Sequence, residues 1–224
     1  MANNKGILFF DLDGTVADSG SGILASMNHV LEARNLQPLT REDLTDFVGP
    51  PLSISFPTVF APRGVPKEEM QMFIEEYRAI YGATYLPQTP LNYGMDDALV
   101  ELKKEWRLAI VTSKPEPQAL IAIQATGVRH YFDIVVGPND DSEIPKAQLL
   151  ERALREMKEL HGKLPPLTSC WMIGDRHHDI DAGVEVGTHC AGVLWGFGSR
   201  EELSSAGATA IVETPQELVA VLNN

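Results

Sequence analysis

The sequence predicts an α/β fold: a Rossmann-like parallel sheet core with helices on both faces and an inserted all-helical cap domain. Two observations support this prediction. After about residue 91, short uninterrupted apolar runs, which are typical of strands buried on both faces, alternate with helical patterns. Between residues 17 and 87 the chain carries helical patterns and several prolines but no long strand. We therefore expect residues 1–16 and 88–224 to form the α/β core and residues 17–87 to form the cap.

The first predicted strand is Gly6–Phe10, and the carboxylates Asp11 and Asp13 follow it in the motif D-L-D-G-T. If the strand continued, both side chains would point to the same side of the sheet, and Gly14 would let the chain turn sharply. Two like charges at the end of a buried strand are unfavourable unless a cation compensates them. An ordinary acidic turn is the alternative. A calcium-binding EF-hand loop is excluded because Gly22 stands where that loop needs a bidentate Glu.

In the expected cap, apolar residues at helical spacing predict one helix that starts near Ile23 and another over Met70–Tyr81. The small residues Ser19–Gly22 predict a flexible connection before the first helix, and Pro87 and Pro90 mark the exit from the cap. These two connections would suit the hinges of a moving cap.

The rest of the chain alternates between predicted helices and strands, as expected for a parallel sheet. The strands are expected at residues 107–112, 132–136, 170–173, 190–194 and 210–212. Helices are expected at residues 95–102, 115–126 and 145–160, and another should end at 186. A capping box of Ser199 and Glu202 begins the next helix, and Thr214 with Glu217 begins the last one.

Ligands of such folds bind beyond the carboxyl ends of the parallel strands, so the residues that follow each strand are the candidates for a site. These positions hold carboxylates, hydroxyl groups and a lysine: Asp11, Asp13, Thr112, Ser113, Lys146, Asp175 and Asp179. Mg²⁺ prefers oxygen ligands and often binds substrate phosphate as well. An aspartate is ionised at neutral pH and needs no base to act as a nucleophile. The set therefore indicates a site for Mg²⁺ and a phosphate.

Four motifs in this order, D-L-D-G-T, V-T-S-K, Lys146 and G-D-R-H-H-D, resemble those of the haloacid dehalogenase superfamily of aspartyl phosphatases. Within it, the chain looks like the phosphoglycolate phosphatase-like branch, whose helical cap is inserted after the first motif. The resemblance covers nearly the whole chain. It implies a phosphoric monoester hydrolase, a Mg²⁺-dependent phosphatase that acts on a small organic phosphate through an aspartyl-phosphate intermediate. The chain departs from that branch at Ala147, where phosphoglycolate phosphatases usually have proline.

The resemblance also implies a role for each matching residue. Asp11 would be the nucleophile, and Asp13 would be the general acid that protonates the leaving oxygen and then the base that activates water. Mg²⁺ would be bound by Asp11, the backbone carbonyl of Asp13, Asp175 and Asp179. Phosphate would be bound by Thr112, Ser113 and Lys146. In the cap, the candidates for substrate contact are Arg78 and the turn Val48-Gly49-Pro50-Pro51.

Three other functions stay open at this point. The chain could be a 5′-nucleotidase that acts on nucleoside monophosphates, or a phosphomutase of the β-phosphoglucomutase kind, because these reactions share the motifs. A non-catalytic phosphate-binding protein is the third, although binding alone would not need Asp13. A P-loop nucleotide enzyme is disfavoured because the sequence lacks the motif G-x-x-x-x-G-K-[ST]. His177 and His178 could suggest a transition metal, but the nearby oxygen ligands favour Mg²⁺.

The formal net charge of the 224 residues is −13. This charge argues against nucleic acid or an anionic membrane as the partner, and the expected partner is a small phosphorylated metabolite.

Cys170 and Cys190 lie in apolar runs and are expected to be small core residues. Because we see neither a signal peptide nor a long apolar run, we expect a cytoplasmic protein, monomeric or homodimeric. The loop Trp195–Gly198 is expected to pack its aromatic side chains on the core.

Overall fold

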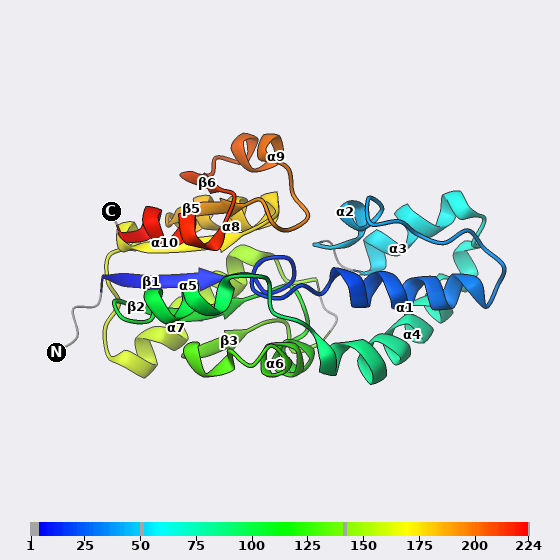
Figure 1. Ribbon diagram of the computed structural model, residues 1–224, viewed down its shortest axis with the longest axis horizontal. Coiled ribbons are helices and arrows are strands. Elements are labelled where there is room, and N and C mark those ends of the chain that lie inside the picture. The colour runs from blue at the N-terminus through cyan, green and yellow to red at the C-terminus, as the bar shows by residue number, and fades with distance from the viewer. Residues whose placement is uncertain (1–4, 50–51, 141–142, 224) are drawn as a thin grey trace.

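The computed structural model describes residues 5–49, 52–140 and 143–223. Within these ranges, parallel strands form one sheet in the order β3-β2-β1-β4-β5-β6 (Figure 1). The strands are β1 (Gly6–Phe10), β2 (Trp106–Val111), β3 (Ile134–Val136), β4 (Cys170–Gly174), β5 (His189–Val193) and β6 (Ala210–Val212). Each strand begins and ends within about two residues of its predicted bounds. The predicted parallel α/β core is confirmed.

Helices cover both faces of the sheet. On one face they pack against Ile7 and Phe9 of β1, and on the other against Leu8 and Phe10. The side chains of β1 are all buried, which explains why its sequence is an uninterrupted apolar run. The helices of this part are α5 (Met95–Leu102), α6 (Glu116–Ala125), α7 (Lys146–His161), α8 (His177–Val186), α9 (Arg200–Ser205) and α10 (Pro215–Asn223), with short 3₁₀ turns at Arg129–Tyr131 and Leu167–Ser169.

Among the described residues of 17–87, the regular elements are helices and helical turns, as predicted. We call residues 20–88 the helical segment. Figure 1 shows its helices beyond the end of the sheet toward which the β1 arrow points, so they lie next to the carboxyl ends of the strands. The segment contains α1 (Gly20–Glu32), α2 (Leu44–Phe47), α3 (Leu52–Phe60), α4 (Met70–Ile80), a π-helical turn (Tyr81–Tyr85) and 3₁₀ turns at Ala61–Arg63, Lys67–Glu69 and Leu86–Gln88.

An aromatic cluster holds the helical segment together. Phe56 stacks on Phe60 with ring centroids 4.9 Å apart, and it also contacts Phe47 and Tyr77 at 5.2 and 5.6 Å. Tyr77 in turn stacks on Tyr81 at 5.6 Å. These rings are buried and belong to the same hydrophobic cluster as one face of the sheet. Apolar contacts therefore continue from the core into the helical segment.

The predicted flexible connection at Ser19–Gly22 is only partly present, because α1 already begins at Gly20. The Ile23 N–H donates to the Ser19 carbonyl at 3.0 Å, which extends the helical hydrogen-bond pattern back to Ser19. Gly22 lies close against Tyr85, where a larger side chain would not fit. The small residues at the start of α1 therefore serve close packing as well as connection.

The predicted capping box of α9 is half present. The Ser199 hydroxyl accepts the Glu202 N–H at 3.1 Å, as predicted. The Glu202 carboxylate, which the motif would direct back to the Ser199 backbone, instead accepts from the Arg176 side chain and from the His177 N–H. The hydrogen bond from Arg176 is charge-assisted and therefore stronger than one from a neutral backbone donor.

No helix among the described residues is both long and apolar enough to cross a membrane. Cys170 and Cys190 are both buried and free, which confirms that they are small core residues. Burial raises the pKa of each thiol to about 11, so both stay protonated near neutral pH.

Candidate active site

The turn after β1 places the first two candidate carboxylates. The Asp11 N–H donates to the Ile173 carbonyl at 2.8 Å, which extends the contact with β4 by one residue. The chain then turns through Gly14, whose φ is +84°, a value that glycine adopts without strain. The Asn92 amide closes the turn by donating to the carbonyl oxygens of Gly14 and Thr15 at 3.1 and 3.0 Å.

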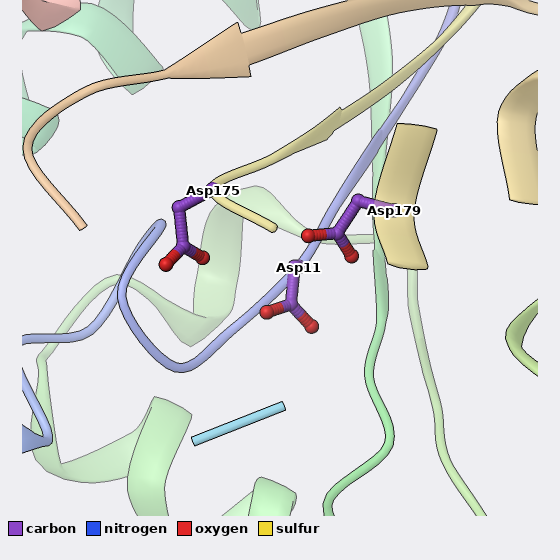
Figure 2. Close-up of side chains that lie close together, drawn as sticks. All are labelled: Asp11, Asp175 and Asp179. Atoms are coloured by element: carbon purple, nitrogen blue, oxygen red, sulfur yellow. The ribbon is translucent and has the colours of Figure 1, made fainter. Parts of the chain in front are cut away.

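Three buried carboxylates meet at the ends of β1 and β4 and at the start of α8 (Figure 2). They belong to Asp11, Asp175 and Asp179, which are 7%, 0% and 1% exposed, and one oxygen from each lies within 4.8 Å of the others. The Thr15 hydroxyl and the Phe197 N–H donate to Asp175 at 3.0 and 2.8 Å. These hydrogen bonds orient Asp175 within the acidic trio, as we call the group formed by Asp11, Asp175 and Asp179.

The electrostatics of the acidic trio match a divalent cation. Burial raises the pKa of Asp11 to about 7, Lys146 opposes this shift, and the charge of Asp179 adds to it. Burial also raises the pKa of Asp175 to about 8, and the charges of Asp179 and Asp11 contribute. A cation that shared these oxygens would relieve both the repulsion and the desolvation. The donor set consists of carboxylate oxygens, which suits Mg²⁺, so the residues fit the ion that the sequence predicts.

Lys146, the first residue of α7, lies beside the acidic trio. Its Nζ is 2.6 Å from the Asp11 carboxylate and also contacts the Asp179 carboxylate. Burial alone would lower the pKa of this lysine, but the charges of Asp11 and Asp179 outweigh it and raise the pKa. The structure thus brings Lys146, Asp11, Asp175 and Asp179 together, as expected from the sequence.

Asp13 is not part of the acidic trio. Its two carboxylate oxygens accept from Lys114 Nζ at 2.8 and 3.1 Å, and the same Nζ lies 3.3 Å from the Tyr81 hydroxyl. Burial alone would lower the pKa of Lys114. The nearby Asp13, Tyr81 and Tyr77 outweigh the effect of burial and raise this pKa. Asp11 and Asp13 follow the end of β1 at Phe10, and although they have separate lysine partners, both line the same cavity.

Lys114 lines the site and pairs with Asp13, a contact that was not predicted from the sequence. It is the last residue of V-T-S-K, three residues after β2 ends at Val111. Its position after a strand was the available signal, because a cation there lies at the same sheet edge as Asp11 and Asp13.

The remaining predicted residues line a cavity of about 1250 Å³ between the sheet and the helical segment. Thr112 and Ser113 lie on its core side together with Asp11, Asp13 and Lys146. Arg78, from α4, lines the same cavity from the helical segment, as do Val48 and Gly49. Pro50 and Pro51 of the predicted turn lie outside the described residues.

The loop Trp195–Gly198 does more than pack on the core. Its two aromatic side chains do contact the main hydrophobic cluster, as expected. In addition, Trp195 Nε1 donates to the Thr15 carbonyl at 2.9 Å, and the Phe197 N–H holds Asp175. A Cβ on Gly196 would stand 2.4 Å from the Asp175 side chain. The loop is therefore a wall of the acidic site.

The model of the family "Haloacid dehalogenase-like hydrolase" matches residues 8–193, which include the acidic trio and both lysines. The chain belongs to this family. The prediction of an enzyme, a phosphoric monoester hydrolase, is confirmed through the family and its phosphatase relatives.

Curated relatives and solved structures extend the likeness over nearly the whole chain. The pyrophosphatase PpaX of Anoxybacillus flavithermus is 30% identical over 221 residues, or 98% of this chain and 97% of the relative. The tyrosine-protein kinase PtkA of Mycobacterium tuberculosis is 32% identical over 208 residues, or 92% and 67%. A haloacid dehalogenase-like hydrolase from Streptococcus pneumoniae superposes with a TM-score of 0.82 at 27% identity, covering 99% of each chain.

Proposed function

We propose that this chain is a Mg²⁺-dependent phosphatase that hydrolyses a small organic phosphate through an aspartyl phosphate on Asp11. The proposal rests on the different surroundings of the two aspartates Asp11 and Asp13. Asp11 lies in the acidic trio beside Lys146, whereas Asp13 lies at the same cavity with Lys114 as its own partner. One carboxylate is thus available to attack phosphorus and another to move a proton.

In the proposed reaction, an oxygen of Asp11 attacks phosphorus and the bond to the leaving oxygen breaks. Protonated Asp13 gives its proton to that oxygen, so the leaving group departs as an alcohol. Asp13 then accepts a proton from water, which attacks the aspartyl phosphate and releases inorganic phosphate and Asp11. Lys146, 2.6 Å from Asp11, stabilises the negative charge that gathers there.

The ion-binding groups proposed are the carboxylates of the acidic trio and the backbone carbonyl of Asp13. When bound, Mg²⁺ would supply charge neutralisation between Asp11 and an incoming phosphate. Thr112 and Ser113 follow β2 at the cavity and are proposed to bind phosphate oxygens with Lys146. Arg78 faces the cavity from the other side and is proposed to contact the organic part of the substrate.

We further propose that residues 17–87 form a cap domain on the core of residues 1–16 and 88–224. The support is the position of the helical segment next to the strand ends and the cavity that both parts line. A cap would limit access of bulk water to the aspartyl phosphate, which is how closing segments usually act. The cytoplasmic location and the monomeric or homodimeric state stay predictions.

Phosphoglycolate and nucleoside monophosphates are the first substrates to test. Pyrophosphate joins them because PpaX carries the name pyrophosphatase. A phosphomutase would return an isomerised sugar phosphate instead of free phosphate, and a phosphotransferase, as the name of PtkA suggests, would move the group to a tyrosine hydroxyl. The products identify the acceptor, so each assay should follow both free phosphate and the labelled phosphoryl group.

The experiment is a phosphate-release panel with Mg²⁺ and with a chelator. We expect turnover of at least one monoester with Mg²⁺, its loss on chelation, and its loss in Asp11→Asn and Asp13→Asn. Asp13→Asn should still bind phosphate, because the acidic trio and Lys146 are intact. The matched control is Asp181→Asn, an exposed carboxylate on the same helix as Asp179. Chelator-resistant turnover, or full activity in Asp11→Asn, would contradict the proposal.

A further inference from the structure

Arg176 connects the loop after β4 with the helical segment. Its Nη1 donates to the carbonyl oxygens of Thr45, at 2.6 Å, and of Val48. These carbonyls lie at the carboxyl-terminal end of α2, where helical carbonyl groups have no partner within the helix. A guanidinium is a suitable partner because it carries several donors in one plane and a charge that favours this helix end.

The same guanidinium is held from the core side. Arg176 Nε donates to the Glu202 carboxylate at 2.9 Å, and that carboxylate also accepts the His177 N–H at 2.8 Å. The side chains of Arg176 and Glu202 are only 12% and 21% exposed, so this pair is shielded from solvent. The direction of the guanidinium is therefore set by α9 on one side and by the end of α2 on the other.

The backbone of Arg176 binds the acidic trio. Its N–H donates to the Asp179 carboxylate at 3.0 Å, and the other oxygen of Asp179 contacts Lys146 Nζ. Lys146 in turn lies 2.6 Å from Asp11. One residue thus contacts the helical segment through its side chain and the acidic trio through its backbone.

We propose that Arg176 is a positioning residue that links the seating of the helical segment to the placement of Asp179 and, through Lys146, of Asp11. When the end of α2 lies against Arg176, the guanidinium has all its partners and the peptide that holds Asp179 is fixed. When the segment moves away, Nη1 loses both carbonyl acceptors and the guanidinium keeps only its contact with Glu202 among the partners described above. Catalytic competence then depends on the closed position of the segment.

The loop after α2 and the loop after β4 approach each other closely beside Arg176. A Cβ built on Gly49 would lie 3.5 Å from both Arg176 Nη1 and the His178 ring, and Gly49 has a φ of +117°. A residue with a side chain would be strained there. The loop that ends α2 therefore sits directly on Arg176.

This inference rests on the proposed phosphatase function, so the test has one arm that needs no activity. In the metal-free protein, hydrogen exchange is measured over residues 44–48 and over β1 in wild type, Arg176→Met and Arg176→Lys. Arg176→Met should speed exchange over residues 44–48 and leave β1 unchanged, and Arg176→Lys should fall between. The control is Arg200→Met, because Arg200 is exposed and pairs only with Glu213 among the hydrogen bonds and ion pairs found in the described chain.

The second arm measures kcat, KM and the Mg²⁺ concentration for half-maximal activity. Arg176→Met should lower kcat or raise the Mg²⁺ requirement about 10-fold or more, as is usual when a group that orients a metal ligand is removed. KM should change less, and Arg176→Lys should recover part of the loss. A purely structural role would lower stability without changing the Mg²⁺ requirement.

The outcomes separate the two proposals. The role of Arg176 would be overturned if residues 44–48 exchanged no faster in Arg176→Met than in Arg200→Met. An unchanged kcat and Mg²⁺ requirement in Arg176→Met would overturn it as well. If the wild type hydrolyses no phosphate ester, the proposed function fails, and the exchange arm together with the thermal shift caused by Mg²⁺ still tests the link. If Arg176→Met does not fold, Arg176→Lys carries both measurements.

Discussion

Replacing Lys114 with methionine should destabilise the protein strongly, because it leaves the Asp13 carboxylate without its cationic partner. Lys114 Nζ lies 2.8 Å from Asp13, and the two side chains are only 8% and 15% exposed. At an effective dielectric constant of about 20, the attraction over this distance is ~6 kcal/mol, most of which desolvation of the two charges offsets. Removing one partner of such a pair typically costs about 3 kcal/mol, which corresponds to a Tm lower by roughly 6–12 °C.

The measurement is urea unfolding of wild type, Lys114→Met, Asp13→Asn and the double variant. Each single change should cost about 3 kcal/mol, and the double variant should cost less than either single change, because neither charge is then left alone. Lys104→Met is the control, since Lys104 pairs with Glu101 at the surface with exposures of 59% and 52%. Its cost should stay below about 1 kcal/mol. Additive costs in the double variant, or equal costs for the two lysine variants, would refute the reasoning.

Three further predictions concern the acidic site and its walls. Saturating Mg²⁺ should stabilise the wild type by ~2.7 kcal/mol at 100 times its dissociation constant, and thermal shift assays should detect this only weakly in Asp175→Ala. Gly196→Ala should cost about 1–3 kcal/mol and most of the activity, because the new Cβ would stand 2.4 Å from Asp175, whereas Gly82→Ala, with open space around it, should leave stability nearly unchanged. Asn92→Ala should cost about 1–3 kcal/mol through its two lost hydrogen bonds, measured against Tyr93→Ala, whose side chain is 98% exposed. Equal unfolding midpoints within either matched pair would contradict the corresponding prediction.

The sequence alone determined the sheet, the helices that cover it and the edge at which the site lies. The reason is physical: apolar runs that end in polar residues identify buried parallel strands, and all such strands end at the same edge. Asp11, Asp175 and Lys146 could therefore be predicted together although they are far apart along the chain. The helical character of residues 20–88 also followed from local periodicity.

The tertiary structure alone decided two further pairs of charged groups. Lys114 meets Asp13 across 101 positions of sequence, and Arg176 meets Glu202 across 26. A local motif assigned Glu202 to a helix cap, but the folded chain brought a guanidinium within its reach, and a charge-assisted bond is stronger than one to a neutral amide. Long-range pairs of this kind depend on how loops from different strands pack together. Local sequence patterns do not predict this packing.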